Sequence, residues 1–90
     1  MTPIEIKKLL REISASQTIL AVVADVPVSD LSVYLNSGRL LKHKADHIAN
    51  CARSLRQFVH AIPVPIDFSR TLEVKDALQK FENGQLEIHT

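Results

Sequence analysis

The stretch from Ser16 to Gly38 constrains the fold more than any other part of the chain. Its sequence, SQTILAVVADVPVSDLSVYLNSG, holds two short apolar patterns separated by a break at Asp25-Val26-Pro27. The first pattern consists of Ile19, Leu20, Val23 and Ala24, and the second of Val28, Leu31, Tyr34 and Leu35. Both contain the i, i+3, i+4 spacing of a helix with one buried face. Because Ala21 is small enough for a close helix crossing, the sequence predicts two helices that cross steeply over a tight turn.

This predicted helix pair resembles the lambda-repressor-like (Xre/Cro-type) helix-turn-helix family. The matching residues are Ser16-Gln17, Leu20-Ala21, Val26, Ser29 as the start of the second helix, Leu31-Ser32, Leu35-Asn36 and Gly38-Arg39. The chain departs from the family pattern at Asp25, a turn position often held by glycine, at Pro27 before the second helix, and at the extra residue Ser37. The resemblance covers roughly residues 4–62 and implies an all-α fold that binds double-stranded DNA.

Five helices are expected in total, with a short strand after the last. The first runs from Pro3 to Ile13, with Thr2 as its N-cap and Glu5 completing the cap. Its apolar stripe comprises Ile4, Ile6, Leu9, Leu10 and Ile13. A fourth helix is predicted over 44–61 after a loop, and a fifth over 70–82 with Ser69 as its N-cap. Residues 85–90 alternate between apolar and polar as a strand does. We divide the chain into a helix-turn-helix domain, 1–62, and a C-terminal extension, 63–90.

Composition and charge narrow the classes of protein. With 90 residues the chain is long enough for one small core, and 46% apolar residues exclude disorder. It has one cysteine and no apolar run of membrane-spanning length, so a cytoplasmic protein without a membrane segment is expected. The net charge is only +1. Positive charge gathers instead between Arg39 and Arg56, and acidic residues gather near the C-terminus.

The resemblance implies that the second helix of this pair, which Ser29 opens, enters the major groove. Its candidate base contacts are Val28, Ser29, Asp30, Ser32, Val33 and Asn36. The valines suit thymine methyl groups, the serines suit bases or phosphates, and Asp30 suits the amino group of cytosine. None of the first five is an arginine, glutamine or asparagine, the residues that make strong two-point contacts with bases. Sequence reading is therefore expected to depend more on Asn36, Arg39 or the shape of the DNA. The alternative is that Ser29 and Asp30 simply cap the helix.

Candidate phosphate contacts flank this helix on both sides. Gln17 opens the preceding helix, where the matching residue of the family commonly holds a phosphate. On the other side, Arg39, Lys42 and Lys44 follow the helix and are expected to contact the DNA backbone. The alternative for these three residues is an ordinary solvated loop.

The C-terminal helix has an apolar stripe with two possible uses. Operators of this family are usually read by two-fold dimers, so the stripe is a candidate homodimer contact. The dimerisation candidates are Val74, Leu78, Phe81, Leu86 and Ile88. The alternative is that the helix covers the core of its own chain.

Catalytic and metal chemistry are poorly supported by the sequence. His43, His47 and Cys51 lie four residues apart, but on a helix they span about 12 Å, too far for one tetrahedral ion. We also expect His43 to precede the helix. The chain lacks a glycine-rich phosphate loop and a nucleophile paired with a base. The expectation is therefore a protein that is not an enzyme and uses no cofactor or metal.

Two functions from different classes remain. The first, implied by the resemblance, is a sequence-specific transcriptional regulator, a repressor or autoregulator of the kind found in phages and mobile elements, acting as a homodimer. The second is a protein-interaction module of the same fold, an antirepressor or inhibitor that does not bind DNA. The protein-interaction function is kept because the net charge is near neutral and because the candidate base contacts include few residues that bind bases strongly.

Overall fold

The computed structural model describes residues 1–62 and 66–84, and these form five α-helices and no strand. The helices are α1 (Pro3–Glu12), α2 (Gln17–Ala24), α3 (Val28–Ser37), α4 (Lys42–Ala61) and α5 (Thr71–Glu82). The all-α prediction is confirmed. The strand predicted at residues 85–90 lies outside the described residues.

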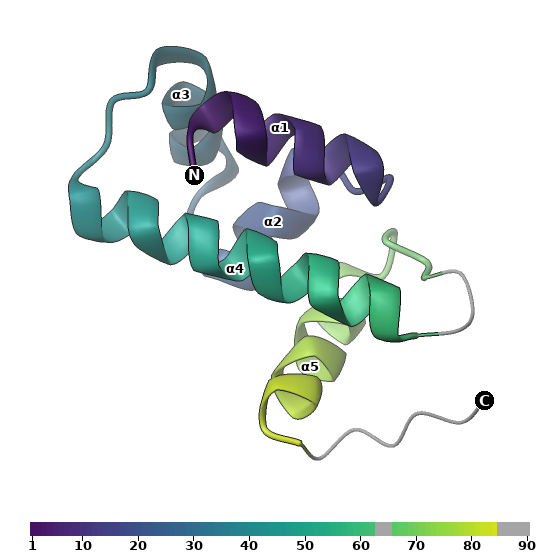
Figure 1. The fold of residues 1–90 in the computed structure, drawn as a ribbon. Helices are drawn as coiled ribbons and strands as arrows, with labels where there is room; N and C mark the ends of the chain where they lie inside the picture. The colour runs from purple at the N-terminus through teal and green to yellow at the C-terminus, as the bar shows by residue number, and fades with distance from the viewer. Residues whose placement is uncertain (63–65, 85–90) are drawn as a thin grey trace.

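The helices enclose one hydrophobic core to which all five contribute. Figure 1 shows α4 crossing the molecule, with α1 and α3 at one side and α5 at the other. The short α2 is the central element and packs against α3, α4 and α5. Its residues Ile19, Leu20 and Ala21 are almost fully buried. The core therefore joins the two parts into which the sequence was divided, because Val74 and Leu78 of α5 belong to it.

The predicted cap of α1 is confirmed, and α2 also begins at a side-chain cap. The Thr2 hydroxyl accepts the Glu5 N–H at 3.2 Å, and the Glu5 carboxylate accepts the Thr2 N–H at 3.1 Å. Hydrogen bonding to Thr2 holds the pKa of Glu5 below its ordinary value. Ser16 caps α2 in the same way by accepting the Ile19 N–H.

Three helix starts differ from the prediction. Helix α3 begins at Val28 with Pro27 as its N-cap and has no side-chain cap, so Ser29 neither opens nor caps it. Helix α4 begins at Lys42 rather than residue 44, which places His43 inside the helix. Ser69 does not cap α5, because its N–H and hydroxyl both donate to the Asp67 carboxylate, at 3.0 and 2.6 Å. These two bonds hold the pKa of Asp67 below its ordinary value.

Two residues of the predicted apolar stripes are exposed. Ile4 in the first turn of α1 and Val28 in the first turn of α3 both face solvent. Their spacing is helical, but no neighbouring element covers the helix at that turn. Within residues 1–62 and 66–84, no single helix is long and apolar enough to cross a membrane. The one pair that reaches this length together, α2 with α3, is bent by 115°.

Candidate nucleic-acid interface

The geometry of the α2–α3 pair depends on the three-residue turn Asp25–Pro27. The chain direction changes by 115° between the two helices. Asp25 ends α2 in a left-handed conformation, with φ 58° and ψ 44°, which aspartate tolerates better than most residues. The N–H groups of Asp25 and Val26 donate to carbonyls of the last turns of α2, at 3.2 and 3.0 Å. The turn is thus closed by backbone hydrogen bonds and sends α3 off at a steep angle.

Helix α3 has a buried face and an outward face. Leu31, Tyr34 and Leu35 are buried against the core. At about 100° per residue, the opposite side is centred on Ser29, Val33 and Asn36. Asn36 and Ser29 are exposed, and the Val33 side chain is 59% exposed. The structure therefore brings three of the predicted base contacts together on one surface, which we call the α3 outer face.

The other predicted base contacts lie on the flanks of the α3 outer face. Ser32 is half-buried, and Val28 is 43% exposed at the opposite edge from Val33. Asp30 is exposed in the first turn. Because α3 has no side-chain cap, the alternative that Ser29 and Asp30 cap it is wrong.

A residue of α1 joins the α3 outer face. The Lys7 ammonium donates to Asn36 Oδ1 at 3.1 Å, and Asn36 Nδ2 donates to the Ser32 hydroxyl at 3.5 Å. Both ends of the Asn36 amide are thus engaged. The sequence shows Lys7 only as one polar residue of an amphipathic helix, and its position beside Asn36 depends on the packing of α1 against α3.

Gln17 lies in a shallow hollow that contains two further basic residues. This hollow, of about 450 Å³, lies where the end of α1 meets the start of α2, and it is lined by Lys7, Leu10, Arg11, Ala15 and Gln17. Lys7 and Arg11 were not among the predicted contacts. The signal that identifies them is their spacing of four residues, which places both on one side of α1.

The basic residues after α3 are divided between different surfaces. Gly38 ends α3 with φ 73°, and Arg39 and Lys42 follow it as exposed residues. Lys44 is also exposed, but it lines a pocket behind the α2–α3 turn. Arg56, farther along α4, lies in a hollow beside Glu5 and Glu12 of α1. The basic stretch seen in the sequence is therefore not one continuous surface.

The predicted dimerisation residues do not form one exposed surface in the described part of the chain. Val74 and Leu78 are buried in the core of their own chain, and Leu78 is only 2% exposed. The half-buried Phe81 packs edge-to-face on Phe58 of α4, with ring centroids 5.6 Å apart. The expectation that Val74 and Leu78 face a second copy is wrong for this position of α5, because α2 and α4 already cover them. Leu86 and Ile88 lie outside the described residues.

His47 and Cys51 of α4 have structural contacts. The Ala24 carbonyl accepts a hydrogen bond from His47 Nε2 at 2.9 Å. His47 therefore supplies a donor for a backbone carbonyl in the last turn of α2. Cys51 Sγ lies 3.8 Å from the same imidazole nitrogen. Burial, with a smaller effect of Glu82, raises the pKa of the Cys51 thiol. In residues 1–62 and 66–84, no group of three or more His, Cys, Asp or Glu side chains is placed to hold a metal ion.

Comparison of the chain with protein-family models, with curated proteins and with solved structures gives no match.

Proposed function

We propose that the chain binds double-stranded DNA sequence-specifically by placing α3 in the major groove. The observation that carries this proposal is the 115° bend between α2 and α3 over a three-residue turn. Helix-turn-helix pairs join two helices at about 90–120° over such a turn, and their second helix lies in the groove. Helix α3 has the exposed outer face that this docking needs.

The α3 outer face offers specific chemistry to base edges. Val33 provides an apolar contact for a thymine methyl group, and Ser29 provides a hydroxyl at the end of the helix that points toward the bases. Asn36 suits a two-point contact with adenine, which requires release of its hydrogen bond with Lys7. Lys7 is then free to contact a phosphate.

Basic side chains flank the α3 outer face on two sides, which supports the proposal because phosphate contacts set the register of a protein on DNA. Lys7, Arg11 and Gln17 share the hollow at the start of α2. Arg39 and Lys42 follow the C-terminal end of α3. The net charge of +1 is compatible with this arrangement, since Arg56 and the acidic residues of α1 gather at a separate hollow.

The role that follows is a transcriptional repressor that occludes a promoter as a homodimer. A two-fold dimer would read half-sites about one helical turn apart. With Val74 and Leu78 inside the core, the dimer contact must use other residues.

One observation favours the second function, an interaction module that binds protein. Helix α3 has no lysine or arginine, and two of its valines, Val28 and Val33, are exposed. Exposed apolar side chains on a helix also suit a protein partner. The experiment must therefore separate DNA binding from protein binding at the same face.

The test is a titration of fluorescent DNA from the region upstream of the chain's own gene, at several salt concentrations and with excess nonspecific DNA. We expect saturable binding that weakens steeply with salt. Val33→Glu places a negative charge at the centre of the α3 outer face and should abolish binding. Leu72→Glu is the matched control, because Leu72 is also exposed but lies on α5. Equal binding by both variants excludes α3 as the DNA contact, and absence of binding by the unmodified chain favours the protein-partner function.

A further inference from the structure

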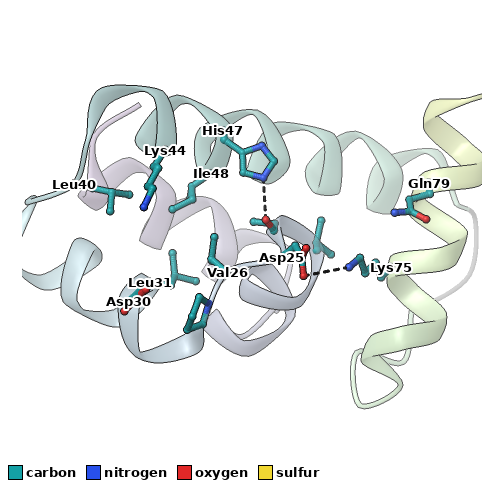
Figure 2. A pocket seen from close by; sticks show the side chains of 13 residues that line it. Asp25, Val26, Asp30, Leu31, Leu40, Lys44, His47, Ile48, Lys75 and Gln79 are labelled. Atoms are coloured by element: carbon teal, nitrogen blue, oxygen red, sulfur yellow. Dashed lines mark hydrogen bonds and ion pairs between the residues drawn. The ribbon is translucent and has the colours of Figure 1, made fainter.

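A pocket of about 660 Å³ lies between the α2–α3 turn, α4 and α5. Its volume is within the range of pockets that hold small molecules, about 300–1,000 Å³. Figure 2 shows side chains from all these elements around it. Val26 from the turn and Leu40 before α4 are only half-buried and, with the buried Ile48, give it an apolar surface. The apolar surface predicts a ligand with a hydrocarbon portion.

Of the two acceptors beside the turn, the Ala24 carbonyl has a hydrogen-bond partner and the Asp25 carboxylate faces a cation. The Ala24 carbonyl accepts from His47 Nε2 at 2.9 Å. The Asp25 carboxylate lies 3.8 Å from the Lys75 ammonium, and its side chain is 91% exposed, directed mainly to solvent. Both contacts are drawn in Figure 2. A ligand therefore finds the Ala24 carbonyl already hydrogen-bonded and the Asp25 carboxylate directed mainly to solvent.

Two ammonium groups lie on different walls of the pocket. Lys44 extends from α4 toward α3, and Lys75 extends from α5 toward the turn (Figure 2). Lys44 makes no ion pair with any residue in the described part of the chain. The 3.8 Å between Lys75 Nζ and Asp25 exceeds hydrogen-bond distance, so Lys75 has N–H donors left. The lining also contains Asp30, so its two lysines and two aspartates carry no net charge. The anionic group of a ligand is therefore assigned to the Lys44 ammonium, since Lys75 already faces Asp25.

We propose that this pocket binds a small amphipathic carboxylate. Its hydrocarbon portion lies on Val26, Leu40 and Ile48, and its carboxylate accepts hydrogen bonds from Lys44, with Lys75 nearby. Occupancy weakens DNA binding, because the ligand lies against the α2–α3 turn that sets the direction of α3. This regulatory consequence rests on the proposed function, whereas the ligand site does not.

The site is tested without DNA. The ¹⁵N-labelled chain is titrated with octanoate below its micelle concentration, and with 1-octanol, which has the same chain length and no charge. We expect octanoate to shift the amide signals of residues 23–27, 40–48 and 75–79 selectively, and to bind about tenfold more tightly than 1-octanol, the effect of a charge-assisted contact. Shifts spread over the whole chain, or equal affinity for the two probes, would overturn the site.

Two lysines of the first turns of α4 provide matched variants. Both are exposed, but only Lys44 lines the pocket. Lys44→Gln should reduce octanoate affinity to that of 1-octanol, and Lys42→Gln should leave it unchanged. If the two variants lose affinity equally, the effect is general charge attraction and the proposed carboxylate contact is wrong.

The regulatory consequence is tested by repeating the DNA titration at saturating octanoate. We expect DNA affinity to fall, and to be unaffected by 1-octanol. If DNA affinity is unchanged while octanoate is bound, the proposed regulation is wrong, but the ligand site is still supported. If the chain binds no DNA with or without octanoate, the proposed function fails and the regulation with it, while the localised amide shifts still decide the ligand site.

Discussion

Replacing Leu78 with alanine tests whether α5 belongs to the core of its own chain. Leu78 is 2% exposed and packs in the cluster that all five helices share. Removing a buried leucine side chain to alanine costs about 2–5 kcal/mol, from the lost transfer free energy and the cavity left behind. For a domain of this size, a loss of about 3 kcal/mol lowers Tm by about 12–24 °C. The chain should stay folded, since small domains are stable by about 5–15 kcal/mol.

The control for Leu78→Ala is the same substitution on the same helix. Leu72 is 75% exposed, so Leu72→Ala should change the free energy of unfolding by less than about 0.5 kcal/mol. Both variants and the unmodified chain are unfolded by heat and by urea, followed by circular dichroism, at two widely separated protein concentrations. Because a helix packed in its own chain unfolds independently of concentration, the loss for Leu78→Ala should be the same at both. A loss that grows on dilution would mean that α5 packs between two copies, which would refute the reasoning.

Three further predictions concern the turn, the first cap and the DNA backbone. Asp25→Ala should destabilise the chain by about 1 kcal/mol, because alanine tolerates the left-handed conformation less well than aspartate. Asp25→Gly should change the free energy of unfolding by less than about 0.5 kcal/mol. Equal losses for the two variants in urea unfolding would point to the lost ion pair with Lys75 instead. Thr2→Ala should destabilise the chain at neutral pH, and the deficit should shrink on acidification. The pKa of Glu5 is lowered in the folded chain from 4.5, so its stabilising effect is present above that value and is lost as the pH falls through the folded pKa; a deficit independent of pH in urea unfolding would contradict this. Arg39→Ala should weaken binding to all DNA sequences and reduce the slope of log affinity against log salt by about one, and an unchanged slope would exclude a phosphate contact.

Features fixed by neighbouring residues in the sequence could be predicted. The caps at Thr2 and Ser16 follow from side chains that reach backbone groups three residues on. Helical spacing identified Leu31, Tyr34 and Leu35 as the buried side of α3, and the outer face follows from it by geometry. Where two local interactions compete, the outcome was not predictable. Ser69 has the chemistry of an N-cap, but the Asp67 carboxylate two residues earlier takes its donors.

Features that depend on tertiary packing could not be predicted. Ile4 fits the apolar stripe of α1 yet is exposed, because burial requires a neighbouring element as well as a helical position. The same limit applies to the candidate site. Lys7 reaches Asn36 across 29 positions of sequence, and no periodicity in either helix indicates that contact. The pocket behind the turn also combines residues of the turn, α4 and α5, which only the fold brings together.

The position of α5 links the C-terminal part of the chain to the presentation of α3. Lys75 of α5 faces Asp25, and His47 of α4 holds the Ala24 carbonyl, so two helices contact the turn just before α3 begins. At the other end of α3, Lys7 of α1 contacts Asn36. The direction of α3 is therefore set from both ends by elements outside the helix pair. Because an exposed ion pair such as that of Asp25 contributes little energy by itself, the position of α5 beside the turn depends mainly on the burial of Val74 and Leu78. A ligand or partner that changes the docking of α5 would consequently act on α3 through the turn, without touching the α3 outer face.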